Sequence, residues 1–401
     1  MKQLACTVMA ALALLPSGIA ETGVRPVPEP IREQFALAPF YQKYLDVGGL
    51  PIVGSAKVSD AALAECGWLV RQMLVKRPDI LTALAKNGVR FAVMAHNEYT
   101  TDVPEHSKLT PRVYWDRRAR GLGATPSAPA VSAAEENLLA YPGDPYPREI
   151  IAIHEFAHAI HEMGLNSVDP TFDKRLTEAY GKALAAGLWK GTYAAVNRQE
   201  YWAEAVQAWF DNNAANDALH NDTNTREKLK TYDPAVAALC EEVFGDIAWR
   251  YSKPSARSAA DRAHLTDLPA NPPRFQWREE PVPERPRIRL QCAAGDLELE
   301  FETAEAKEAI TKLLAQVHEG YFSGGRATFE AESFILAPSA KLPDGSAVPA
   351  GTSPWRVALR GETVAPALRS EVKKGGVLIP KLIEISEASG GVAVQRIVRL
   401  N

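Results

Sequence analysis

The 401-residue chain has little excess charge, few cysteines and only one long apolar run. Its 45 basic and 49 acidic residues leave a net charge of −4, which gives no electrostatic reason to expect nucleic acid as the main partner. With 46% hydrophobic and 23% charged residues, the composition excludes collagen-like, coiled-coil and wholly disordered chains. The length predicts two globular domains.

The apolar run lies at the N-terminus and predicts an export signal. Lys2 precedes an apolar stretch from Leu4 to about Leu15, and small residues lead to a cleavage site near Ala20. The stretch is too short for a comfortable membrane span, and no later segment reaches its length. We therefore expect residues 1–20 to be a signal peptide and the mature chain to be secreted or periplasmic, without stable membrane insertion.

Removal of the signal leaves three of the four cysteines, Cys66, Cys240 and Cys292. An exported chain can pair two of them, and we expect Cys66 to pair with Cys240 because both precede the Pro-rich stretch described below. Three buried free thiols are the alternative.

Turn signals and apolar periodicity predict a mainly helical first unit with a few strands. Ser59 is expected to cap a helix, and residues 89–94 and 112–115 are expected to be strands, whereas 121–147 reads mostly as loop. Further helices are predicted over 148–163, 173–186, 198–210 and 234–249. Gly164 is expected to end the first of these, because glycine commonly follows the last residue of a helix.

A Pro-rich stretch separates this unit from the rest of the chain. Such a stretch is extended, semi-rigid and resists packing. We therefore expect a first domain over 21–265, a linker over 266–287 and an accessory domain over 288–401, which reads as a small mixed α/β or β-rich unit. The fold class expected for the whole chain is α+β.

The sequence His154-Glu155-Phe156-Ala157-His158 lies in the middle of the helix predicted over 148–163. Two histidines four residues apart project from one helix face, so both imidazoles can reach one zinc ion. Glu155 follows the first histidine and can act on a metal-activated water. This motif predicts a zinc site.

A catalytic zinc site needs a third protein ligand. His161 shares the helix face but lies about 10 Å along the axis from His154, too far for one ion. The better candidate is Glu200, and Glu204 lies on the same face of the later helix. We expect Glu200 to bind zinc and Glu204 to hydrogen-bond a liganding histidine and fix its tautomer. A solvated acidic face is the alternative.

These two segments resemble those of the gluzincin metallopeptidases, in which H-E-x-x-H is followed on a later helix by E-x-x-x-D/E. Over residues 130–215 the resemblance narrows to the protease domain of anthrax lethal factor, on the segments His154–Ala159 and Glu200–Ala205. The resemblance implies a zincin-like fold, mainly helical with a small sheet. It also implies that Tyr193, seven residues before the liganding glutamate, faces the metal and stabilises the oxyanion.

The function expected is therefore a zinc-dependent endopeptidase acting on a peptide or protein substrate, with Glu155 as the general base. The resemblance further implies that a strand near the active helix pairs with the substrate, and the strands around Val93 and Val113 are both candidates. Two other functions stay open. One is a zinc-site scaffold without turnover, and the other is a zinc hydrolase of non-peptide amides or esters. The sequence does not indicate the oligomeric state.

The C-terminal unit weakly resembles the opening of a cyclophilin-type peptidyl-prolyl isomerase. The resemblance rests on the strand-like Leu297–Phe301, a helical pattern and Glu319-Gly320-Tyr321-Phe322-Ser323-Gly324. Phe329-Glu330-Ala331-Glu332 stands where that family carries its catalytic arginine. The resemblance therefore implies an inactive accessory module, and an unrelated small domain is the alternative.

Overall fold

The computed structural model describes residues 23–278 apart from 111, 218 and 267, followed by 285–292, 295–300 and shorter segments between 313 and 399. The expected signal peptide lies outside the described residues. Across the described part of the chain, no helix is both long and apolar enough to cross a membrane.

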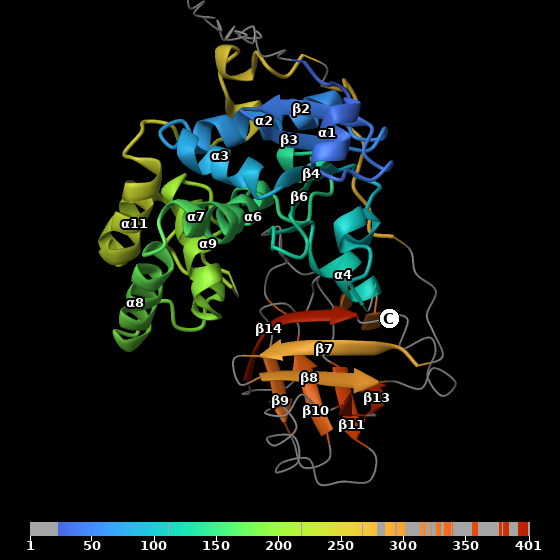
Figure 1. Ribbon diagram of the computed structural model, residues 1–401. Coiled ribbons are helices and arrows are strands. Elements are labelled where there is room, and N and C mark those ends of the chain that lie inside the picture. The colour runs from blue at the N-terminus through green and yellow to red at the C-terminus, as the bar shows by residue number, and fades with distance from the viewer. Residues whose placement is uncertain are drawn as a thin grey trace, which may run out of the picture.

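A six-stranded sheet organises the first unit, in the order β1-β2-β3-β4-β6-β5 (Figure 1). The strand β4 pairs in parallel with β3 and with β6, and the other pairs are antiparallel. The bounds are β1 Arg25–Pro26, β2 Lys43–Val47, β3 Leu50–Gly54, β4 Arg90–Met94, β5 Gly121–Leu122 and β6 Ala130–Ala134. The short strand β5 therefore forms one edge of the sheet.

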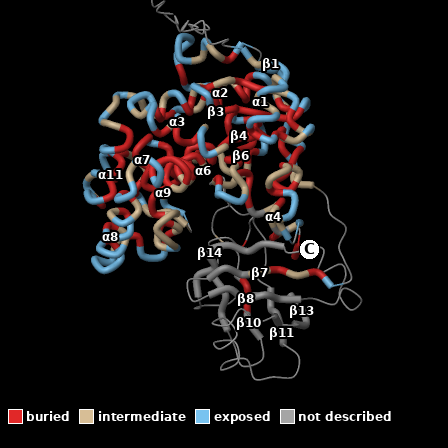
Figure 2. The backbone as a smooth tube through the Cα atoms, viewed as in Figure 1, coloured by how far each residue is buried: buried red, intermediate tan, exposed pale blue. Residues whose placement is uncertain are grey.

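Successive residues of the central strands enter two different cores, because side chains alternate across a strand. Phe91 and Val131 face the larger core, whereas Ala92 and Ala134 face a smaller one built around Tyr41. Parallel strands covered on both faces are nearly continuous in buried residues, as β3, β4 and β6 are (Figure 2).

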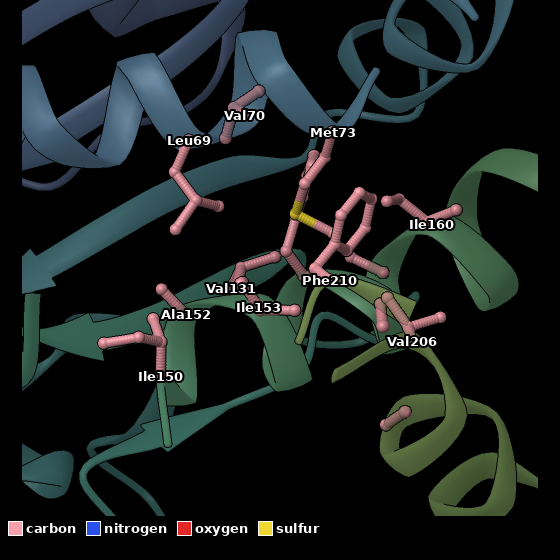
Figure 3. Close-up of a cluster of buried hydrophobic side chains, with 14 of the residues drawn as sticks. Leu69, Val70, Met73, Val131, Ile150, Ala152, Ile153, Ile160, Val206 and Phe210 are labelled. Atoms are coloured by element: carbon pink, nitrogen blue, oxygen red, sulfur yellow. The ribbon is translucent and has the colours of Figure 1, made fainter. Parts of the chain in front are cut away.

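Helices fill the larger core and build the lobe beside the sheet. Their bounds are α1 Glu29–Gln34, α2 Asp60–Met73, α3 Pro78–Lys86, α4 Arg112–Arg118, α5 Glu135–Leu138, α6 Ile151–Ala159, α7 Asn166–Val168, α8 Phe172–Ala185, α9 Arg198–Trp209, α10 Arg226–Tyr232 and α11 Pro234–Phe244. Short 3-10 turns occupy Thr100–Asp102, Pro104–His106, Tyr193–Ala195, Pro254–Ala256 and Ala260–Arg262. Figure 3 shows side chains of α2, β6, α6 and α9 meeting in one cluster around Met73. The fold is α+β, as expected.

Several expected elements are confirmed. Ser59 accepts a hydrogen bond from the amide of Ala62 and caps α2, and the strand expected at 89–94 is β4. The helices expected at 173–186 and 198–210 are α8 and α9. The helix expected at 234–249 is shorter, because Gly245 adopts a φ of 71° directly after α11.

One strand expected beside the sheet is wrong. Residues 112–115 form the start of helix α4, in which Arg112 pairs with Asp116 one turn later at 3.1 Å, and Asp116 accepts hydrogen bonds from Thr101. The stretch 121–147 is mostly loop, as expected, but it also contains β5, β6 and α5. The strand β6 was missed because alanine and serine, which supply four of its five residues, have low β-propensity.

The helix expected at 148–163 does not end at Gly164. It begins at Ile151 and continues after Ala159 through a π-helical stretch, Ile160–Leu165, into α7. A Cβ atom on Gly164 would lie 2.8 Å from Cγ2 of Ile80. Glycine at this position therefore permits close packing against α3 and does not cap a helix.

The two cysteines expected to pair are both free and buried, Cys66 on α2 and Cys240 on α11. Burial raises the pKa of both thiols well above the ordinary value. Cys292 lies in a part of the chain whose side chains are outside the description.

Part of the expected linker packs against the first unit, contrary to the expectation that it resists packing. Phe275 is buried, its amide donates to the carbonyl of Pro142 at 2.8 Å, and the hydroxyl of Tyr99 donates to the carbonyl of Gln276 at 2.7 Å. Arg278 pairs with Asp102 at 2.6 Å. The domain boundaries themselves stay a prediction.

The C-terminal unit contains an eight-stranded sheet in the order β12-β8-β7-β14-β9-β10-β11-β13. Its strands are β7 Arg287–Cys292, β8 Gly295–Glu300, β9 Arg326–Phe329, β10 Ser333–Ala337, β11 Trp355–Leu359, β12 Val377–Leu378, β13 Pro380–Glu384 and β14 Val392–Arg399. The strand expected at 297–301 is β8. Glu330–Glu332 lie outside the described residues, and the cyclophilin resemblance stays a prediction.

Candidate metal centre

Helix α6 carries His154, Glu155 and His158 and packs against β6 and α9. Two asparagine side chains from neighbouring segments satisfy the first amides of this helix. Oδ1 of Asn212 accepts from the amide of Ile150 at 2.7 Å, and Oδ1 of Asn137 accepts from that of Ile151 at 2.8 Å. These bonds replace a local cap and fix where α6 begins.

The structure brings His154, His158 and Glu200 together. One ligand atom from each lies within 4.8 Å of the other two. Nε2 of His154 lies 3.2 Å from Nε2 of His158 and 3.0 Å from Oε2 of Glu200, and Nε2 of His158 lies 3.4 Å from the same oxygen. A tetrahedral ion with bonds near 2.05 Å places its ligands about 3.3 Å apart. The spacing of the three ligand atoms therefore fits zinc.

The orientation of His154 is set by Gln207. Nδ1 of His154 donates to Oε1 of Gln207 at 2.7 Å, and Nε2 of Gln207 donates to Glu149 at 3.0 Å, which fixes the amide orientation. With its proton on Nδ1, His154 presents the lone pair of Nε2 to the site. Glu204, the expected partner of a liganding histidine, lies farther away, at 3.6 Å from Nδ1 of His154.

Sequence reasoning missed Gln207, although a signal was present. Gln207 follows Glu200 by seven residues and Glu204 by three, so all three share one face of α9. Searching that face for any hydrogen-bond acceptor, and not for carboxylates alone, would have found it.

The electrostatics of the site favour a positive charge between these groups. Burial alone raises the pKa of Glu200, but hydrogen bonds and charge from His154 and His158 outweigh burial and hold that pKa well below its usual range. Burial lowers the pKa of His154, whereas Glu200, Glu155 and Glu204 together raise it to about 10. A cation bound here replaces the proton that these carboxylates otherwise attract.

Tyr193 also lies at the site. Its hydroxyl donates to Oε1 of Glu200 at 3.0 Å, so the two oxygens of Glu200 have different partners. The ring of Tyr193 stacks on the imidazole of His154 with centroids 6.1 Å apart. The tyrosine singled out by the resemblance is therefore adjacent to the proposed ligands.

The edge strand β5 runs beside α6. A Cβ atom on Gly121 would lie 2.9 Å from Cγ of Glu155, and one on Gly123 would lie 2.7 Å from Cβ of His158. Neither segment expected to pair with substrate has this position, because Val93 lies in the central strand β4 and Val113 in helix α4. Gly121 in β5 and Gly123 just after it therefore let this edge of the sheet approach α6 closely.

His161 is buried and contacts Asp173 on α8. Its Nε2 lies 2.9 Å from Oδ1 of Asp173, which also accepts from Nε of Arg198 at 2.8 Å. Burial lowers the pKa of His161. His161 therefore ties the π-helical stretch to the first turn of α9, on which Glu200 lies.

No family model and no curated protein matches this chain. A search of solved structures finds a Pro-Pro endopeptidase from Paenibacillus alvei, 22% identical in sequence, with a TM-score of 0.28. The match covers 48% of this chain and 94% of that protein. The resemblance to the lethal factor protease domain stays a prediction.

Proposed function

We propose that the chain is an exported zinc-dependent endopeptidase that cleaves extended peptides. The observation that carries this proposal is the convergence of His154, His158 and Glu200 at tetrahedral spacing, with Glu155 on the same helix. Two imidazoles and one carboxylate form one of the donor sets that catalytic zinc sites use. When bound, zinc supplies Lewis acidity and lowers the pKa of coordinated water towards neutrality.

Three residues of this chain have the remaining roles in the proposed reaction. Glu155 takes the proton of the attacking water on its carboxylate and passes it to the leaving amine. The hydroxyl of Tyr193 donates a hydrogen bond to the oxyanion that develops on the scissile carbonyl. Gln207 keeps the proton of His154 on Nδ1, so that Nε2 remains available as a ligand.

The substrate is proposed to pair with the edge strand β5. An extended peptide can add a strand to an exposed sheet edge through main-chain hydrogen bonds. Gly121 and Gly123 lie against Glu155 and His158, so a peptide on this edge passes the groups that act on it.

The proposal is tested by measuring zinc content and cleavage of a mixed peptide library for wild type, Glu155→Gln and His154→Ala. Glu155→Gln is expected to keep one zinc per chain and to lose at least about a thousandfold in turnover, whereas His154→Ala loses zinc as well. Glu162→Gln is the control. Glu162 lies in the π-helical stretch that continues α6, and it accepts a hydrogen bond from Gln199. This variant is expected to retain activity.

Each other outcome contradicts the peptidase. If wild type and Glu155→Gln bind zinc equally and wild type cleaves no peptide, the chain is a zinc-site scaffold or a hydrolase of non-peptide amides or esters. A panel of ester and amide substrates separates these two functions. Wild type without zinc would overturn the whole site.

A further inference from the structure

The segment that follows α9 contacts three separate parts of the candidate site. We call residues 212–217 and 219–220 the post-α9 segment. Asn212 holds the first turn of α6 through the amide of Ile150, and Nδ2 of Asn213 donates to Oε2 of Glu204 on α9 at 2.9 Å. The carbonyl of Leu219 accepts from the amide of Tyr193 at 2.7 Å. One segment therefore links α6, α9 and the turn that carries Tyr193.

His220 and Asp217 give this segment its shape. Oδ1 of Asp217 accepts hydrogen bonds from the amides of Leu219 and His220 at 2.9 Å each and lies 2.8 Å from Nδ1 of His220. The other oxygen of Asp217 pairs with Arg148, just before α6, at 2.5 Å. The Leu219 carbonyl, which accepts the hydrogen bond from the Tyr193 amide, is thus fixed within a small hydrogen-bonded turn.

The anchor of this turn is an ion pair with Glu204. Nε2 of His220 lies 3.5 Å from Oε2 of Glu204, and both side chains are almost fully buried, with exposed fractions of 8% and 3%. Burial lowers the pKa of His220, but Glu204 and Asp217 outweigh burial and raise it well above the usual value. Breaking a buried pair leaves an uncompensated charge, which costs far more than breaking an exposed one.

We propose that His220 is a positioning residue for Tyr193. Its pairs with Glu204 and Asp217 hold the Leu219 carbonyl in place, and that carbonyl holds the backbone of Tyr193 so that the hydroxyl reaches the reaction centre. The kinetic part of this inference rests on the proposed peptidase function. The sequence alone does not single out His220, because it lacks ligand spacing.

A double-mutant cycle between His220→Gln and Tyr193→Phe tests the proposal. His220→Gln is expected to lower kcat about tenfold, since small misplacements of a catalytic group are costly, with KM and zinc content within about twofold of wild type. In the Tyr193→Phe background the same change is expected to have little further effect. His264→Gln is the matched control, because His264 also pairs with a buried carboxylate, Glu65, at 2.8 Å.

A second measurement does not depend on activity. Hydrogen exchange of the Tyr193 amide is expected to accelerate at least about tenfold in His220→Gln and in Asp217→Asn, and to stay unchanged in His264→Gln. Unchanged protection in both variants would overturn the inference even if wild type cleaves no peptide. Additive effects of His220→Gln and Tyr193→Phe on kcat would overturn the inference as well. A wild-type protein that binds no zinc and cleaves no peptide would refute only the proposed peptidase function.

Discussion

The hydroxyl of Tyr193 donates a hydrogen bond to Oε1 of Glu200 at 3.0 Å, while Oε2 of the same carboxylate lies 3.0 Å from Nε2 of His154. One carboxylate thus contacts both the proposed ligand set and the proposed oxyanion donor. This relationship lets Tyr193 orient Glu200.

Tyr193→Phe is expected to lower kcat by roughly 10- to 100-fold, because the variant keeps the ring but loses the donor. Zinc affinity is expected to fall only a few-fold, since Oε2 of Glu200 keeps its position. Steady-state assays on a defined peptide measure kcat, and a competitive zinc titration measures zinc affinity. A kcat equal to that of wild type would exclude Tyr193 as the oxyanion donor.

The variants Gln207→Leu and Glu204→Gln test which residue is the hydrogen-bond partner of His154. Gln207 is the partner in the structure, and Glu204 is the one expected from the sequence. Gln207→Leu removes the acceptor of the His154 proton and is expected to weaken zinc binding about 10- to 100-fold. Glu204→Gln keeps the shape of a side chain 3.6 Å from His154 and is expected to weaken it less. Zinc competition against a chelator gives both values, and the reverse order would assign the role to Glu204.

Gly121→Ala is expected to destabilise the protein and to impair turnover. The added methyl group would lie 2.6 Å from Cγ2 of Ile151 and 2.9 Å from Cγ of Glu155, so β5 or α6 must shift. Gly181→Ala is the control, because nothing lies within 4 Å of a Cβ at this position of α8. The control is expected to stabilise by about 0.5–1 kcal/mol through helix propensity. Urea unfolding and peptide cleavage measure both variants, and a fully active, stable Gly121→Ala would contradict the close approach of β5.

His106 is expected to make stability depend on pH. The side chain is buried, which lowers its pKa to about 4, and Nε2 lies 3.1 Å from Oγ of Ser132. Below about pH 6.5 the unfolded chain binds the proton and the folded chain does not, so stability falls as the pH drops towards 4. The loss between pH 7 and pH 5 is about 2 kcal/mol.

Because other groups also titrate, the measurement for His106 is a difference. Urea unfolding of wild type and His106→Gln at pH 7 and pH 5 is expected to show the smaller pH dependence in the variant. Equal pH dependence in both proteins would mean that His106 is protonated as readily in the folded state as in the unfolded state.

The parts of the fold that follow local rules were predictable from the sequence. The helices α8 and α9 show clear periodicity with a glycine or an asparagine at one end, and β4 is a run of apolar residues beside a turn. Residues 112–115 carry strand-like side chains but form a helix, in which Arg112 and Asp116 pair one turn apart and Thr101 donates hydrogen bonds to Asp116. Tertiary contacts of this kind have no local sequence pattern.

For the candidate site, the sequence could bring together residues on one helix face but not residues from distant loops. His154 and His158 follow from their spacing, and Glu200 from its place on one helix face with Glu204. The roles of Gln207 and His220 depend on how α9 and the post-α9 segment pack against α6. The edge strand β5 was missed because two residues are too few to produce an alternating pattern.

The packing of Phe275 and Arg278 on the first unit shortens the tether to the second. Only nine peptide steps separate Arg278 from Arg287, where β7 begins, so the chain between them spans about 30 Å at most. The start of the second unit is confined to a small volume around the anchor formed by Asp102.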